Sequence, residues 1–264
     1  MPFVNSQGVR IHYEVEGQGP PLVLHHGLPN NLQSWKRNRF TNALNADYKL
    51  ILVDARGHGD SEKPHDSQAY GPEMMTGDIV AVLNDLDVEK TNFWGYSMGG
   101  RIGFQLTRYH SSHFSSYILG GSSPFPRQSA AAQHAMNQIT TALRVGVEKG
   151  PEAVVAFLEN LRGQKLPAEL RQRFLSNDYN ALYALSQNMF TWNLTGDRLS
   201  KISVPCLLYA GDQDPRHDGA KEAATRIPQA SFVSLLGLNH ARARDSHQII
   251  QHAKKFLTQV TNAS

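Results

Sequence analysis

The chain has 264 residues, which is enough for one large domain or for a core domain with a modest insertion. Hydrophobic residues make up 40% and charged residues 19% of the chain, as is typical of a globular protein with a sizeable core. Lys and Arg number 26 against 23 for Asp and Glu, and they form no concentrated basic stripe, so nucleic-acid binding is not expected.

Cysteine usage and the length of the apolar runs argue against two further classes, disulfide-stabilised proteins and membrane-spanning proteins. Cys206 is the only cysteine, so no intramolecular disulfide is possible and nothing indicates an oxidising compartment. We find no signal-peptide pattern in the first residues and no apolar run long enough to span a bilayer. The sequence therefore predicts a cytoplasmic protein without a membrane partner.

Short apolar runs alternate with segments of helical length along most of the chain. Residues 9–16 alternate between polar and apolar and predict an edge strand. Unbroken apolar runs predict strands buried on both faces at 22–25, 49–53, 91–94, 115–119, 204–210 and 231–236. The segments between them predict helices at 33–44, 72–86, 98–110, 218–226 and 246–260. This alternation predicts an α/β fold with a doubly wound, mostly parallel sheet.

One region interrupts the alternation. From about residue 122 to residue 199 we find no convincing strand, but helical patterns at 128–149, 152–161, 168–176 and 179–192. A helical insertion within an α/β sheet predicts a cap. We therefore expect a core formed by residues 1–121 and 200–264 and a helical cap, or lid, formed by residues 122–199.

The pentapeptide Gly95-Tyr96-Ser97-Met98-Gly99 is the strongest chemical signal in the sequence. It fits the pattern G-x-S-x-G, follows a predicted strand and precedes a predicted helix, which is the context of a nucleophile elbow. The flanking glycines leave room for neighbouring backbone, and the helix N-terminus favours developing negative charge. Ser97 is the predicted nucleophile.

A serine hydroxyl needs a positioned base, and the base needs an acid to fix its tautomer. Among the 12 histidines, we predict His240 as the base, because it lies on a loop after the last predicted strand. Two aspartates follow the strand before it. We favour Asp214, which lies further past the strand end, over Asp212, which is expected to hold the loop. The order Ser97, Asp214, His240 is the chain order of α/β-hydrolases.

With these motifs, the chain resembles the α/β-hydrolase superfamily and, within it, the serine esterase, lactonase and cofactor-free perhydrolase branch. His26-Gly27 after a predicted strand matches the oxyanion-loop motif of that family, and residues 54–61 match its D-x-R-G-x-G-x-S turn. The resemblance covers nearly the whole chain. It implies an oxyanion hole formed by the backbone N–H groups of Leu28 and Met98.

The resemblance implies hydrolysis of a carboxylic ester or lactone through an acyl-enzyme, with a small-molecule substrate. Dehalogenases and epoxide hydrolases of this fold use an aspartate nucleophile, so Ser97 argues against both. Carbon–carbon bond hydrolysis and perhydrolysis remain as alternatives. Pro29, two residues after the oxyanion-loop glycine, matches the perhydrolase loop. A ligand receptor that retains a slow triad is the non-enzymatic alternative.

The sequence gives no indication of a cofactor or a metal. It has no G-x-G-x-x-G after the first parallel strand, no P-loop and no H-E-x-x-H. We therefore expect neither a cofactor nor a metal site. The natural substrate and the oligomeric state do not follow from these motifs, because the cap selects the substrate while the triad selects the reaction class.

Overall fold

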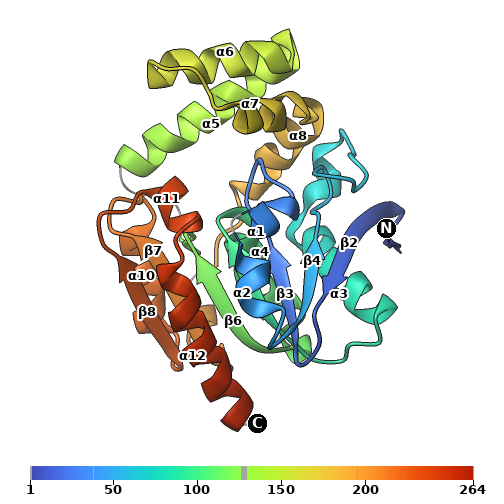
Figure 1. Ribbon diagram of the computed structural model, residues 1–264, viewed down its shortest axis with the longest axis vertical. Coiled ribbons are helices and arrows are strands. Elements are labelled where there is room, and N and C mark those ends of the chain that lie inside the picture. Colours follow the sequence, from blue (N-terminus) through green and yellow to red (C-terminus); the bar gives the residue numbers. More distant parts are fainter. Residues whose placement is uncertain (1, 38, 126–129, 195, 264) are drawn as a thin grey trace.

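Eight strands form a single sheet in the order β1-β2-β4-β3-β5-β6-β7-β8 (Figure 1). The computed structural model describes residues 2–37, 39–125, 130–194 and 196–263. β1 pairs antiparallel with β2 and β2 with β4, and all other neighbours are parallel, which confirms the predicted fold class. The strands are β1 (Phe3–Ser6), β2 (Val9–Glu16), β3 (Pro21–His25), β4 (Lys49–Val53), β5 (Thr91–Tyr96), β6 (Phe114–Gly120), β7 (Cys206–Gly211) and β8 (Ala230–Leu235).

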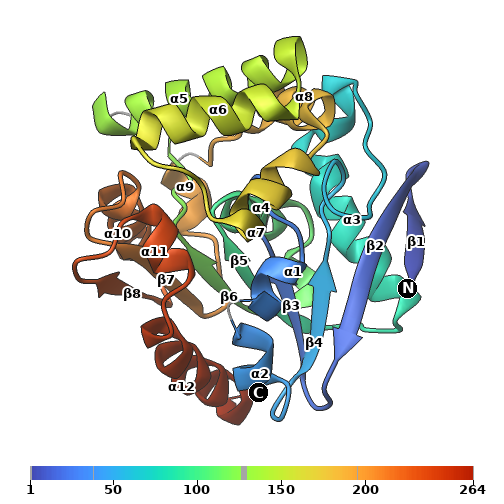
Figure 2. The same cartoon turned by 45° about the horizontal axis from the view of Figure 1, so that its top comes forward.

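Helices cover both faces of the sheet. The helices α3 (Pro72–Asp85), α4 (Met98–Tyr109) and α10 (His217–Arg226) share one apolar cluster with the sheet. A second cluster joins the opposite face to α1 (Gln33–Arg37), α2 (Phe40–Leu44) and α12 (Gln248–Ala263). Both layers are visible in Figures 1 and 2. In the described residues no helix has the length and apolar character needed to cross a membrane.

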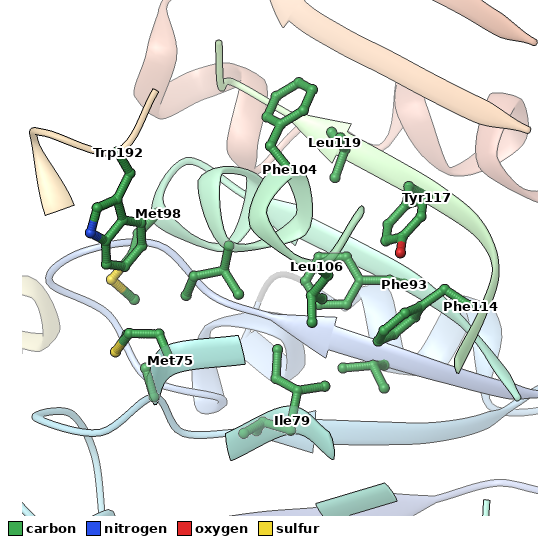
Figure 3. Packing of buried hydrophobic residues seen from close by; sticks show 14 of the residues in the cluster. Met75, Ile79, Phe93, Met98, Phe104, Leu106, Phe114, Tyr117, Leu119 and Trp192 are labelled. Carbon is green, nitrogen blue, oxygen red and sulfur yellow. The ribbon is translucent and has the colours of Figure 1, made fainter. Parts of the chain in front are cut away.

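The central strands are apolar throughout because both of their faces are buried. In β3, Val23 belongs to the first cluster, whereas Leu22 and Leu24 belong to the second. The side chains of successive strand residues point to opposite faces, so a strand between two helical layers has no polar face to expose. Figure 3 shows the first cluster around Phe93 of β5, which packs edge-on against Phe114 of β6.

Helices occupy the space between β6 and β7 in the described part of that segment. They are α5 (Ala130–Lys149), α6 (Pro151–Arg162), α7 (Ala168–Leu175), α8 (Tyr179–Met189) and the short α9 (Gly196–Leu199). The helices α5 to α8 form the upper layer of Figures 1 and 2, and we call this layer the cap. The cap has a small apolar cluster of its own, centred on Leu143, Val154, Tyr179 and Leu182. The boundaries predicted for the two domains, at 121/122 and 199/200, stay a prediction.

Several local predictions were wrong. Val9–Glu16 is not the edge strand, because β1 pairs along its outer side. β8 is not buried on both faces, since it is itself an edge and most of its residues are partly exposed. The single helix predicted at 33–44 is two helices, separated near Arg39, whose φ of 57° is incompatible with a continuing helix. Residues 128 and 129 of a predicted cap helix lie outside the described residues.

Candidate active site

Ser97 lies at the sharp turn between β5 and α4. Its backbone has φ 58° and ψ −107°, a strained conformation for a residue other than glycine, and its N–H donates to the Gly120 carbonyl at 2.8 Å. A Cβ atom at Gly95 would lie 2.3 Å from the Gly99 oxygen, and one at Gly99 would lie 2.3 Å from the His25 oxygen. Both glycines of the pentapeptide are therefore required by close backbone packing, which holds the turn in place.

The structure brings the three predicted triad residues into one hydrogen-bonded chain. His240 Nε2 lies 3.0 Å from Ser97 Oγ, and His240 Nδ1 lies 2.5 Å from Asp214 Oδ2. The Asp214 side chain is fully buried, whereas 30% of the His240 side chain is exposed. His240 does not lie on a loop as predicted: it is the first residue of helix α11 (His240–Arg244), which Asn239 caps. Asp212 is exposed and does not contact His240 in the described structure.

The charges of the site favour a neutral base and an ionised acid. Burial lowers the pKa of His240, and the Arg216 guanidinium lowers it further, although Asp214 acts in the opposite direction. Burial alone would raise the pKa of Asp214, but the hydrogen bond from His240 and the charge of Arg216 bring it below its usual value. At neutral pH, His240 is thus available to accept a proton from Ser97.

Tyr96 is a contact of the base that sequence reasoning missed. Its hydroxyl donates to the His240 carbonyl at 2.6 Å, and its ring packs on the imidazole with centroids 5.2 Å apart. Gly121 follows β6 with φ 53°, and a Cβ there would lie 2.7 Å from the Tyr96 hydroxyl. Position 96 is the variable second residue of the G-x-S-x-G pattern, so the motif gives no indication of this role.

The oxyanion loop is held by His26. Its Nε2 accepts from the Ala55 N–H at 3.1 Å, so the proton is on Nδ1, which lies 3.1 Å from the Gly27 oxygen. The Asn30 N–H donates to the same oxygen at 2.8 Å. Because C=O and N–H point in opposite directions across a trans peptide, the Leu28 N–H points away from Asn30.

Two backbone donors near Ser97 are without partners. Among the described residues, neither the Leu28 N–H nor the Met98 N–H has a hydrogen-bond acceptor. Met98 is the first residue of α4, where N–H groups have no intrahelical partner. Gly27 brings the loop close, since a Cβ there would lie 2.9 Å from Ser97 Cβ. The two donors are the ones that the family resemblance assigns to an oxyanion hole.

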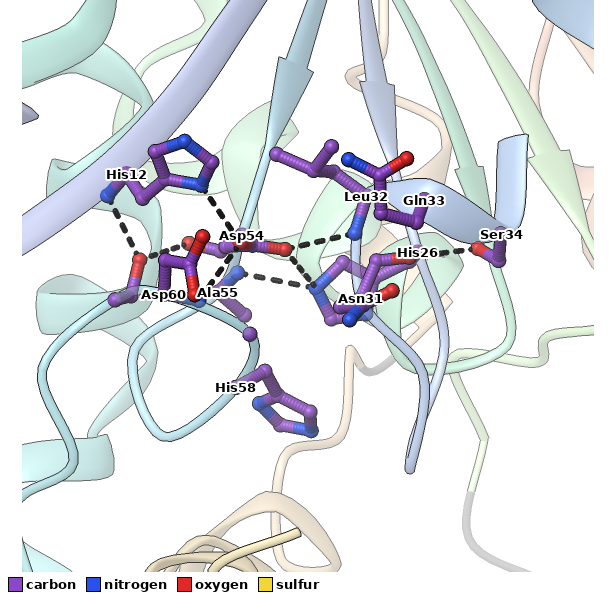
Figure 4. Close-up of polar contacts among 12 residues, drawn as sticks. His12, His26, Asn31, Leu32, Gln33, Ser34, Asp54, Ala55, His58 and Asp60 are labelled. Carbon is purple, nitrogen blue, oxygen red and sulfur yellow. Dashed lines mark hydrogen bonds and ion pairs between the residues drawn. The ribbon is translucent and has the colours of Figure 1, made fainter. Parts of the chain in front are cut away.

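Behind this loop, Asp54 joins three segments of the core (Figure 4). One carboxylate oxygen accepts from the Leu32 N–H at 2.7 Å, and the other lies 2.8 Å from His12 Nδ1 and 3.0 Å from the Asp60 N–H. His12, Asp54 and Asp60 are spaced closely enough to hold a metal ion. Because each Asp54 oxygen accepts a backbone hydrogen bond from a different segment, we interpret the group as a structural brace for the oxyanion loop.

A cavity of about 680 Å³ lies between the triad and the cap. Ser97, His240 and both candidate oxyanion residues line one end of it. The walls contributed by the cap are mostly apolar and include Ile139, Leu143, Val154, Leu158, Tyr179 and Met189. On the side of α10 the lining is charged. The cap therefore contributes an apolar wall to the cavity in front of Ser97.

Arg101, one turn after Ser97 on α4, also lines this cavity and was not identified from the sequence. Its side chain is nearly buried, with 8% of the residue exposed. The guanidinium donates to the Trp192 carbonyl and, at 3.5 Å, to the Ser123 carbonyl, and its Nε has no partner. No carboxylate of the described residues forms an ion pair with it, and burial lowers its pKa to about 10. In the part of the chain that the structure describes, its positive charge is thus balanced by backbone carbonyls and not by a carboxylate.

The fold and this site define an α/β hydrolase. The sequence matches the family described as "alpha/beta hydrolase fold" over residues 20–240. The chain therefore belongs to this family of enzymes.

The names of individual relatives state different activities. The chain is 29% identical over 261 residues to a "Putative non-heme chloroperoxidase" of Synechocystis sp., covering 91% of this chain and 94% of the relative. It is 25% identical over 245 residues to a "Putative 2-succinyl-6-hydroxy-2,4-cyclohexadiene-1-carboxylate synthase" of Bacillus subtilis, covering 88% of each chain. A solved structure of an N-acyl homoserine lactone degrading enzyme is similar at 26% identity and a TM-score of 0.74, covering 97% of this chain and 100% of the other.

Proposed function

We propose that the protein hydrolyses a carboxylic ester or lactone through an acyl-enzyme on Ser97. The observation that carries the proposal is the hydrogen-bonded chain from Asp214 through His240 to Ser97. It borders the cavity and lies beside two backbone N–H groups that have no acceptor among the described residues. Nucleophile, base, orienting acid and oxyanion donors are the four parts that serine-based acyl transfer requires.

In the first half-reaction, Ser97 Oγ attacks the carbonyl carbon while its proton passes to His240 Nε2. The N–H groups of Leu28 and Met98 stabilise the oxyanion, and each such donor typically accounts for about 10²–10³ in rate. The C–O bond to the leaving group then breaks, and the imidazolium returns the proton to the departing oxygen. In the second half-reaction, water gives a proton to His240 Nε2 and attacks the acyl carbon. The bond from that carbon to Ser97 Oγ then breaks, the imidazolium returns the proton to Oγ, and the carboxylic acid is released.

The shape and lining of the cavity indicate which part of a substrate fits. Its cap-side wall is apolar, so an acyl or alkyl group without charges is favoured there. The guanidinium of Arg101, which forms no ion pair with a carboxylate of the described residues, favours an anionic group instead, because a buried cation is stabilised by an anionic partner. We infer a substrate with an apolar body and an acidic group. The lactone-degrading relative supports a cyclic ester as one form of it.

Perhydrolysis is the second candidate, supported by the relative named as a chloroperoxidase and by Pro29, which lines the cavity. Hydrogen peroxide would replace water as the nucleophile on the acyl-enzyme, and the product would be a peracid. Peracid formation from a short ester and peroxide tests this candidate. Equal rates of peracid formation for the native protein and Pro29→Leu would show that Pro29 does not promote perhydrolysis.

The main proposal is tested by labelling with a fluorophosphonate probe and by a panel of aryl esters that differ in acyl length and in a terminal carboxylate. We expect label on Ser97, ester turnover, and loss of both in Ser97→Ala with an unchanged circular dichroism spectrum. Label that survives in Ser97→Ala would show that the nucleophile is another residue. Turnover of a vinylogous diketone in place of esters would favour carbon–carbon bond hydrolysis, and binding without turnover would favour a receptor.

A further inference from the structure

Arg216 is bonded to the acid of the proposed triad. Its backbone N–H donates to Asp214 Oδ1 at 3.0 Å, and its guanidinium Nη1 donates to the same oxygen at 3.3 Å. The other oxygen, Oδ2, lies 2.5 Å from His240 Nδ1. The Asp214 side chain is fully buried and that of Arg216 is 15% exposed. The carboxylate is thus held between two cationic groups, one of which is the base itself when protonated.

Two further charged or titratable groups lie near His240, and one of them, Arg244, also lowers the pKa of the imidazole. Arg244, on the same helix as His240, forms a two-point ion pair with Asp245, at 2.5 and 2.7 Å. Tyr96, from β5, donates to the His240 backbone, and burial raises its pKa well above the usual value, so it stays neutral. Within the described structure, Arg216 is the one cationic side chain bonded to Asp214 apart from His240.

We propose that Arg216 is a positioning residue of the triad, which fixes the Asp214 carboxylate toward His240 and limits how strongly that carboxylate holds a proton on the imidazole. The inference rests on the proposed function for its kinetic consequences, but not for its structural ones. A charge-assisted bond on Oδ1 leaves Oδ2 as the oxygen directed to His240. The positive charge of Arg216 also repels an imidazolium and draws electron density from the carboxylate.

The sign of the effect follows from these charges. Without Arg216, the negative charge of Asp214 is opposed only by burial and by Arg244, so the imidazolium is better stabilised and the pKa of His240 rises. The acid limb of the kcat/KM profile should then move to higher pH. A change of about 0.5–1 pH unit is expected for partly screened charges at this range. The plateau rate should fall about 3- to 10-fold, which corresponds to a looser orientation of the imidazole.

The experiment compares kcat/KM against pH for an uncharged aryl ester in the native enzyme, Arg216→Gln, Arg216→Met and Arg216→Lys. We expect the shift in Arg216→Gln and Arg216→Met, and a profile close to the native one in Arg216→Lys. Arg242→Gln is the matched control, because Arg242 lies exposed on α11, two residues after His240, and has no contact with Asp214 in the described structure. Its profile should be unchanged.

Three results would overturn the proposal: an acid limb that stays in place in both neutral variants, a shift of equal size in Arg242→Gln, or a shift in Arg216→Lys as large as in Arg216→Gln. If the protein hydrolyses no ester, the proposed function fails, yet Arg216 can still be tested. NMR titration of the His240 ring in the native protein and in Arg216→Gln reports the same pKa change without any substrate. An unchanged His240 titration would then rule out the role of Arg216.

Discussion

Two aspartates that lie two positions apart have different surroundings. Asp214 is buried, and its oxygens bond to His240 on one side and to Arg216 on the other. Asp212 is exposed, and its N–H donates to the Leu235 carbonyl of β8. The turn that begins at Gly211 is close to the chain after β8, since a Cβ at Gly211 would lie 1.9 Å from the Leu238 oxygen. This close approach of the two turns brings Asp214 next to His240.

We expect Asp214→Asn to lower kcat by about 10⁴, because an amide cannot stabilise the imidazolium and can impose the wrong tautomer on His240. Asp212→Asn should change kcat less than about twofold, since the side chain is exposed and Asp212 contacts β8 through its backbone N–H, which the substitution keeps. Steady-state kinetics on protein whose folding is verified by circular dichroism measures both. Comparable losses in the two variants would contradict the assignment of Asp214.

The cap is a helical layer whose inner side forms the wall of the cavity. Helix α5 contributes Ile139 and Leu143 to that wall, while Val147 on the same helix is 40% exposed. Helix α8 packs on η1 (Ser67–Tyr70), a turn of the core, and Arg101 donates to carbonyls at both connections of the cap to the core. The position of the cavity wall is thus fixed relative to Ser97 by contacts on several sides.

Ile139→Trp should shorten the apolar part of the cavity. The larger ring occupies space that a long acyl chain would use, and overpacking of this kind typically costs about 1–3 kcal/mol. We expect kcat/KM for an octanoate ester to fall about 10- to 100-fold relative to an acetate ester. Val147→Trp serves as the control, and its acyl-length profile should match that of the native enzyme. A uniform loss over all chain lengths in Ile139→Trp would indicate general damage to the site.

The molecule as a whole buries three neutral histidines beside the active site. His25, His26 and His58 are each at most 1% exposed, and burial lowers the pKa of His25 and His58 to about 4 and that of His26 well below its usual value. The unfolded chain protonates these rings below about pH 6.5. Unfolding therefore takes up protons in acid, and the folded state is favoured most where the rings are neutral in both states.

The free energy of unfolding should be highest above about pH 6.5 and should fall as the pH is lowered toward 4. Each histidine contributes a slope of up to about 1.4 kcal/mol per pH unit in this window. Urea denaturation at constant ionic strength from pH 7 to pH 4.5 measures the slope. His58→Gln should flatten it, whereas His252→Gln, at an exposed position on α12, should leave it unchanged. A free energy of unfolding that is independent of pH would contradict the proposed burial of neutral rings.

Much of this architecture follows from local sequence patterns. Unbroken apolar runs such as 49–53 predict buried strands, because a strand between two layers has no polar face. The helical insertion between β6 and β7 and the elbow at Ser97 are equally local, since helical periodicity and a glycine-flanked turn are properties of adjacent residues. The fold class and the membership of the α/β hydrolase family could therefore be predicted before any contact was known.

Other features depend on distances between residues far apart in the chain. Ser97 and His240 are 143 positions apart, and their contact exists because β5, β6, β7 and β8 are neighbours in the sheet. Several features have no periodic signal in the sequence. These are the edge position of β1, the break near Arg39, the burial of Arg101 and the bond between Arg216 and Asp214. They result from strand order, from packing against the cap and from the direction of side chains in three dimensions. For that reason only the tertiary structure shows which charges surround the proposed base.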